Sequence, residues 1–174
     1  MLKLVRNLAL TGAAGLLMAG NAFAGTSPQT TTFQVTANVI KSCKVNATAL
    51  AFGTYDPLLA TSATGTSTVS VQCTKTTVAT IALNGGVNGS LAQRKMKDTG
   101  SSLDLLNYQL YTTAANTAVW GDGTGGTSTQ SYTSISNATV QPFTVYGTIP
   151  SGQDVTPSSV ANSYQDTITV TVTF

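Results

Sequence analysis

The feature that most constrains this chain is a strict alternation of apolar and polar residues, which is clearest near its two ends. FQVTANVIKSC, starting at Phe33, places apolar side chains at every second position, and SYQDTITVTVTF at the end alternates them with threonines. A period of two is typical of strands that bury one face. Because most domains fray at their termini, we expect these two ends to pair with other strands.

Composition also predicts an all-β fold. Thr occupies 32 positions and Gly occupies 16, while every acidic residue is an aspartate. Thr favours strands and Gly favours turns, whereas the helix formers Glu, Lys and Arg are scarce. Turn signals such as Asp56-Pro57 and Asn84-Gly85-Gly86 separate short alternating runs. This spacing predicts a β-sandwich, in which Pro142 marks an edge or a bulge.

Residues 1–24 have the pattern of a secretory signal peptide. Lys3 and Arg6 precede an apolar run from Leu8 to Met18, and Ala22-Phe23-Ala24 is a small-x-small cleavage pattern. A membrane anchor needs roughly 20 continuous apolar residues, and this run is shorter. Removing the segment leaves six cations and six aspartates, so the formal charge of +2 falls to zero. Even +2 is too small for an electrostatic nucleic-acid binder.

The absence of histidine argues against most enzyme chemistry. His is the usual general base and the commonest metal ligand, and the chain contains none. Its many serines and threonines therefore have no imidazole to activate them. We expect no catalytic residue, no metal site, no cofactor and no small-molecule substrate.

Two polar clusters have a functional and a structural interpretation. Trp120-Gly121-Asp122-Gly123 can be a sugar or calcium site, but calcium needs six to eight oxygen ligands. A turn after a packed Trp is favoured. Arg94-Lys95-Met96-Lys97 can face an anionic surface, but a solvated strand or loop face is favoured.

Cys43 and Cys73 are the only cysteines, and an exported chain meets an oxidising compartment. A bridge between them is worth roughly 3–4 kcal/mol in the chain-entropy model. A redox pair usually has a shorter spacing such as C-x-x-C. We therefore expect a structural disulfide.

Taken together, these segments resemble the spore coat protein U-type domain, the pilin family of archaic chaperone–usher pili, and within it a major-subunit-like pilin. The resemblance runs from about Phe33 to Phe174. It is carried, in order, by FQVTANVIKSCKV, LAFGTYDPL, VSVQC, RKM, NYQLYTTAANTAVWGDGT, FTVYGTIPSGQDV and SYQDTITVTVTF.

The resemblance implies an incomplete immunoglobulin-like β-sandwich that is completed by donor-strand addition. It implies an N-terminal donor-strand extension at 25–40 and a pilin domain at 41–174, with the Cys43–Cys73 disulfide of the family. The partners would be a periplasmic pilus chaperone, an outer-membrane usher and neighbouring pilin subunits in a head-to-tail homopolymer.

Carried over by position, the donor side chains would be Phe33, Val35, Ala37 and Val39. If the run up to Cys43 also contains the first strand of the fold, the donor shifts toward Pro28–Gln34. The last strand, which borders the groove and binds the chaperone, would carry Ile168, Val170, Val172 and Phe174.

The function implied by the resemblance is a structural subunit of an extracellular cell-surface fimbria, used for adhesion and biofilm formation. Two alternatives remain at this stage. One is a spore or cell-coat protein secreted by the same machinery. The other is a soluble lectin-like domain that binds carbohydrate through Trp120.

Overall fold

The computed structural model describes Gly25 and residues 27–100, 102–158 and 160–174. The expected signal peptide, residues 1–24, lies outside the described residues. The chain divides into two units, 1–38 and 39–174. Nowhere in the described ranges is there a helix of the length and hydropathy that crossing a membrane requires.

Strands dominate the second unit, and the described residues contain no helix. This confirms the predicted all-β class. Nine strands form in this part of the chain: β1 (Cys43–Ala47), β2 (Ala63–Cys73), β3 (Val78–Leu83), β4 (Arg94–Asp98), β5 (Leu105–Tyr111), β6 (Gln130–Thr133), β7 (Gln141–Ile149), β8 (Tyr164–Gln165) and β9 (Val170–Thr173).

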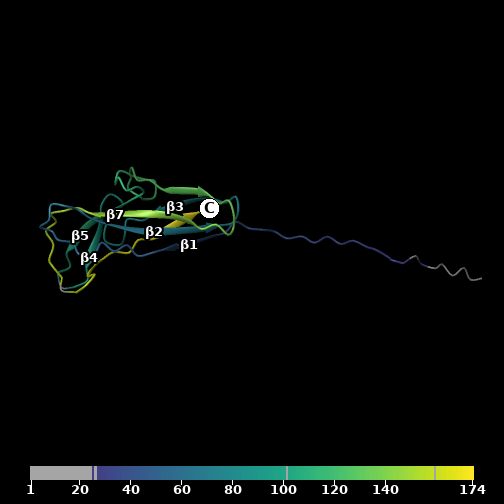
Figure 1. The fold of residues 1–174 in the computed structure, drawn as a ribbon, viewed down its shortest axis with the longest axis horizontal. Helices are drawn as coiled ribbons and strands as arrows, with labels where there is room; N and C mark the ends of the chain where they lie inside the picture. Colours follow the sequence, from purple (N-terminus) through teal and green to yellow (C-terminus); the bar gives the residue numbers. More distant parts are fainter. Residues whose placement is uncertain (1–24, 26, 101, 159) are drawn as a thin grey trace, which may run out of the picture. The chain divides into compact units, whose positions relative to one another are not determined.

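The strands form two sheets, as in an immunoglobulin-like sandwich (Figure 1). One sheet has the order β1-β2-β7-β5-β4-β8 and the other has the order β6-β3-β9. All the pairs are antiparallel. The last stretch of the chain changes sheets, because β8 pairs with β4 of the first sheet and β9 pairs with β3 of the second.

The core lies where the alternating faces of the two sheets meet. In β2, Val69 and Val71 are buried as the pattern predicts, and their strand pairs with β7 over nine residues. In β3, Ile81 and Leu83 are buried in the same hydrophobic cluster. Burying aliphatic side chains of this size contributes about 1.5–3 kcal/mol each, so these faces fix the register of the strands.

Of the strand expected from Phe33 to Cys43, only the last residue, Cys43, lies in a strand of the structure. β1 starts at Cys43, and residues 27–42 belong to no strand. The physical reason is that a strand needs a partner for its backbone N–H and C=O groups, and none of the described strands pairs with this segment.

Pro142 lies in the interior strand β7 rather than in an edge strand. It faces Ser70 of β2 on one side, whereas β5 pairs with β7 only at Tyr146–Thr148. Among the described strands, the end of β7 that carries Pro142 therefore has β2 as its one partner, and the missing N–H costs no bond to β5.

The expected disulfide is present between Cys43 and Cys73. The two residues face each other in the β1–β2 ladder, with their Cα atoms 4.1 Å apart. Beside the bridge, the Thr74 N–H donates to the Ser42 carbonyl at 2.9 Å. The bridge therefore fixes the beginning of the edge strand β1 to the end of its neighbour β2.

Candidate functional site

An apolar groove of about 970 Å³ opens between the two sheets. Its floor is made of core side chains that the alternating strands turn inward. Among them are Val69, Leu83, Met96, Leu106, Tyr108, Leu110, Val145 and Ile149. Segments 47–55, 155–158 and 160–168 form its sides, together with Val170. The groove is therefore an unfilled part of the sandwich core.

Two edge strands flank this groove. Within the described residues, β1 pairs with β2 alone and β9 pairs with β3 alone. Cα atoms of β1 and β9 come within 8 Å of each other. After β1, the Thr48 N–H still donates to Thr68. Unpaired strand edges beside an apolar groove are a template for one more strand.

A pair of glycines shapes one wall of the groove. Gly65 of β2 and Gly147 of β7 face each other in the ladder. A Cβ at Gly147 would lie 2.8 Å from Phe52 and 2.9 Å from Leu50. The segment after β1 can therefore lie flat on the sheet, where Phe52 contacts Tyr108 edge to face at a centroid distance of 6.1 Å.

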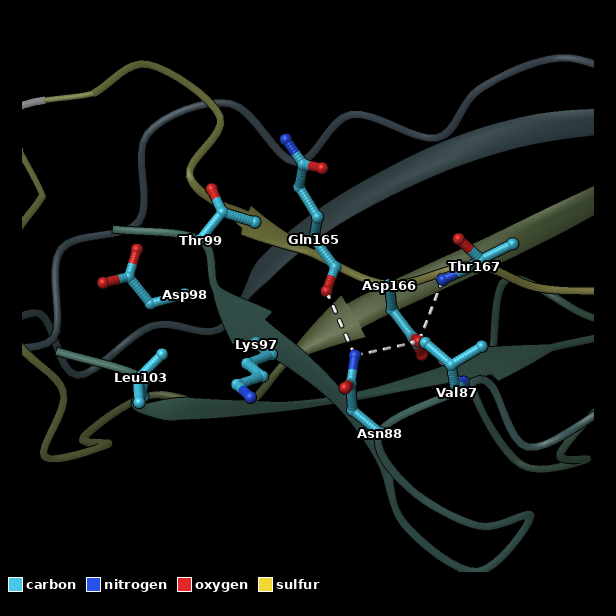
Figure 2. A pocket seen from close by; sticks show the side chains of 9 residues that line it. All are labelled: Val87, Asn88, Lys97, Asp98, Thr99, Leu103, Gln165, Asp166 and Thr167. Atoms are coloured by element: carbon cyan, nitrogen blue, oxygen red, sulfur yellow. Dashed lines mark hydrogen bonds between the residues drawn. The ribbon is translucent and has the colours of Figure 1, made fainter. Parts of the chain in front are cut away.

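Asp166 holds the last segment of the chain where it changes sheets. Its carboxylate accepts hydrogen bonds from the Tyr108 hydroxyl at 2.7 Å, the Val87 N–H at 2.9 Å and the Asn88 side-chain amide at 3.3 Å. Figure 2 shows the Asn88 and Thr167 bonds around this carboxylate. Burial and the bond to Asp166 raise the pKa of Tyr108, which keeps its hydroxyl a proton donor.

Arg94 of β4 is fully buried and connects both sheets. Its guanidinium donates to the Asn84 carbonyl at 2.7 and 3.0 Å, to the Trp120 carbonyl at 2.7 Å and to Gln109. Burial lowers the pKa of Arg94, while nearby Tyr108 and Asp166 raise it. A buried cation requires such acceptors, and here backbone carbonyls supply most of them.

The comparisons with known proteins identify the family. The family model of the Spore Coat Protein U domain matches residues 29–171. The chain belongs to this family. A curated relative, Protein U of Myxococcus xanthus, is 38% identical over 181 residues, covering 95% of each chain.

A solved structure resembles this Spore Coat Protein U domain at 30% sequence identity, with a TM-score of 0.54. It is the CsuC–CsuE chaperone–tip adhesion subunit pre-assembly complex from the archaic chaperone–usher Csu pili of Acinetobacter baumannii. The match covers 78% of this chain and 40% of the solved chain. The fold is therefore similar to that of a chaperone–usher pilus subunit, a structural class without enzymatic activity.

The four predicted donor side chains of the Spore Coat Protein U domain lie together in the segment before β1, and all are exposed. Phe33, Val35 and Val39 are 83–85% exposed, and Ala37 is exposed as well. The segment has no strand assigned to it. Their role as donors stays a prediction.

The predicted groove-edge side chains lie in or next to β9. Ile168, Val170 and Val172 are half-buried and pack against the core, and the first two line the groove. Phe174 lies just beyond β9 and is 52% exposed, although the pattern predicted that it faces inward. It follows the last ladder residue, Thr173, so the pairing with β3 does not hold it against the core.

Trp120 is fully buried and donates from its indole nitrogen to the Ile81 carbonyl at 3.1 Å. It therefore offers no face for stacking on a sugar. Asp122 accepts hydrogen bonds from the N–H and hydroxyl of Thr124, as a turn requires. The described residues contain no group of three or more acidic, Cys or His side chains that fits a metal.

The interpretation of Arg94-Lys95-Met96-Lys97 as a solvated face is wrong for its first residue. Lys97 is exposed, but Arg94 is the buried connection between the sheets. Sequence reasoning also missed Asp166, Tyr108 and Gly86, which meet only in the folded chain. One available signal was Asp166 itself, a lone charge inside an otherwise strand-like apolar run.

Proposed function

We propose that this protein is an exported pilin subunit of the chaperone–usher type, which polymerises by donor-strand exchange into a cell-surface fibre. The observation that carries the proposal is the apolar groove between two edge strands. Such a groove suits an extended strand, whose backbone bonds to the edges while alternate side chains enter the groove.

The donor in this proposal is the N-terminal segment of a second copy of the chain. Phe33, Val35, Ala37 and Val39 alternate with polar residues, so one face of this segment is apolar. Three of these side chains are almost fully exposed. Because donor and groove are different surfaces, each copy can donate to one neighbour and accept from another. Such head-to-tail contacts do not close and produce a fibre.

Before assembly, the groove needs protection. The unpaired edge of β9 belongs to the sequence TITVTVTF, which has high β-propensity, no charge and no proline. Such segments aggregate when unpaired. We propose that a periplasmic chaperone fills the groove until an outer-membrane usher exchanges it for the next subunit. The solved Csu pre-assembly complex of a chaperone with a subunit supports the step in which a chaperone binds the subunit before assembly.

On the cell surface, the fibre would serve adhesion and biofilm formation. A second candidate is a coat protein that uses the same pairing. The description of the family and the similarity to Protein U over 95% of both chains favour it. Isolated fibres on cells support the pilus, whereas a continuous layer supports the coat.

The test uses two matched double substitutions in the donor segment, with the chain co-expressed with its chaperone and usher. Phe33→Ser with Val35→Ser removes two apolar side chains, whereas Gln34→Ser with Thr36→Ser changes the opposite face. We expect the first pair to abolish fibres in electron micrographs while the chaperone complex still forms. The chain with Gln34→Ser and Thr36→Ser should form both the fibres and the chaperone complex.

Fibres of normal length from the Phe33→Ser, Val35→Ser chain would contradict the donor assignment. A stable soluble monomer, purified without any partner, would contradict the pilin function itself, since the open groove and the free β9 edge would then need no cover.

A further inference from the structure

The segment from Gln165 to Thr167 is a thin wall with cavities on both sides. It lines the apolar groove, and it also lines a second cavity of about 390 Å³ shown in Figure 2. Side-chain packing therefore supports this segment weakly. The segment also joins β8 to β9, so its position sets where the β9 edge lies.

Polar bonds replace the missing packing. The Asp166 carboxylate accepts a hydrogen bond from Tyr108 in the larger sheet and from Val87 and Asn88 in the loop after β3. Gly86 leaves the space that this carboxylate occupies, because a Cβ there would collide with it. Asp166 therefore fixes the wall to both sheets.

Arg94 extends this support to β9. Its guanidinium holds the Asn84 carbonyl, and the Asn84 side-chain oxygen accepts the Thr169 N–H at 2.9 Å. The Asn84 N–H in turn donates to the Thr169 carbonyl at 3.1 Å. A chain of hydrogen bonds thus runs from a buried cation in β4 to the residue before β9.

We infer that Arg94 and Asp166 are positioning residues for strand exchange, which hold segment 165–169 and the β9 edge ready for an incoming strand. The inference rests on the proposed function, because it assigns these residues to the groove that receives the donor. Neither residue contacts the donor in this account. They act through Asn84, Tyr108 and the backbone of segment 165–169.

The test starts from the complex of the full chain with its chaperone. A synthetic peptide of residues 28–42, PQTTTFQVTANVIKS, is added in excess, and release of the chaperone and the lifetime of the peptide complex are measured. Arg94→Lys keeps the charge but not the forked geometry. Asp166→Asn keeps the shape but not the charge. Lys75→Met, which removes an exposed cation from the loop between β2 and β3, outside both cavities, is the control.

We expect the lifetime of the peptide complex to fall about tenfold in Arg94→Lys and about threefold in Asp166→Asn, with no change in Lys75→Met. Amide hydrogen exchange should accelerate at 166–173 while β2 and β7 stay protected, which a general loss of stability would not produce. If Arg94→Lys does not fold, the result for Asp166→Asn decides whether the inference holds.

Two outcomes overturn the inference, and they differ. If the peptide releases no chaperone from the wild-type complex, the proposed function fails and the inference fails with it. If the wild type exchanges strands but both variants match its lifetime and its exchange at 166–173, only the positioning role of Arg94 and Asp166 is wrong.

Discussion

Gly86 is the residue whose replacement most directly tests the packing around Asp166. Its backbone has φ +82°, a left-handed conformation that disfavours side chains, and the Asp166 carboxylate occupies the place of a Cβ. Gly126 has almost the same backbone, with φ +80°, but an added Cβ there would meet nothing within 4 Å. The two glycines therefore separate backbone strain from the collision with Asp166.

We predict that Gly86→Ala lowers the free energy of unfolding by about 3 kcal/mol, because conformational strain adds to the loss of buried hydrogen bonds. Gly126→Ala should cost about 1 kcal/mol. Urea unfolding of the chain bound to the peptide of residues 28–42, followed by the fluorescence of Trp120, the single and fully buried tryptophan, measures both. Equal losses in the two variants would contradict the packing described around Asp166.

Three aspartates make stability depend on acid pH. Hydrogen bonds lower the pKa of Asp98, first from the Ser102 hydroxyl and then from the Gly100 N–H. Bonds from Thr156 lower the pKa of Asp104, and bonds from Thr124 lower that of Asp122. Each carboxylate is thus more acidic in the folded chain than in the unfolded chain, where the pKa is about 3.9.

A folded pKa below the unfolded one gives stability that is present above the unfolded value and is lost as the pH falls through the folded value. We predict that the free energy of unfolding of the peptide complex, measured in urea, decreases steadily from about pH 5 to about pH 2. Ser102→Ala should flatten this slope, because it removes the main bond that lowers the pKa of Asp98. An unchanged slope in Ser102→Ala would contradict this assignment.

At the scale of strands, the pairing of Gly65 with Gly147 lets the segment after β1 lie on the larger sheet. We predict that Gly147→Ala destabilises the protein by about 1–3 kcal/mol, because the added methyl group collides with Leu50 and Phe52. Gly147→Ala combined with Phe52→Leu should recover part of the loss. Unfolding of the peptide complex in urea measures both, and a neutral Gly147→Ala would show that this contact is absent.

The interior strands could be predicted from sequence because each carries its own pattern. Val69 and Val71 are buried in the face that alternation indicated, and β5 lies within the apolar run from Leu103 to Tyr111. Phe33–Cys43 has an equally clear pattern but does not form a strand before Cys43. Alternation reports the face that a strand would bury, whereas a strand also needs a partner.

The groove could be anticipated only as an implication of the family resemblance. No local pattern reveals that, among the described residues, β9 pairs with β3 alone, since this depends on strand order. The hydrogen bonds made by Arg94 were even harder to predict from the sequence. Arg94 stands next to Lys95 and close to Lys97 in an apparently solvated run, and only the fold turns it inward to meet Asn84, Gln109 and Trp120.

At the scale of the whole molecule, the low charge suits the proposed role of a subunit that packs against copies of itself. Only 8% of residues are charged, against about 25% in an average soluble domain. Without the expected signal peptide, six cations balance six aspartates. A net charge far from zero keeps proteins monomeric, because the copies repel each other. Without the signal peptide, this chain would have a net charge of zero and no such repulsion.

The central claim is that the donor segment of one copy enters the groove of another with its apolar face inward. Site-directed disulfide formation tests it. Chains carrying Val170→Cys in the groove rim are assembled with chains that carry one cysteine in the donor segment. The positions are 33, 35, 37 and 39 on the apolar face, and 34, 36 and 38 on the polar face.

Covalent dimers in non-reducing gels are the measurement. We predict dimers for at least one position of the apolar face, the one whose register brings it to residue 170, and none for the polar face. Dimers that form equally from both faces, or fibres that form while no position gives a dimer, would contradict the account.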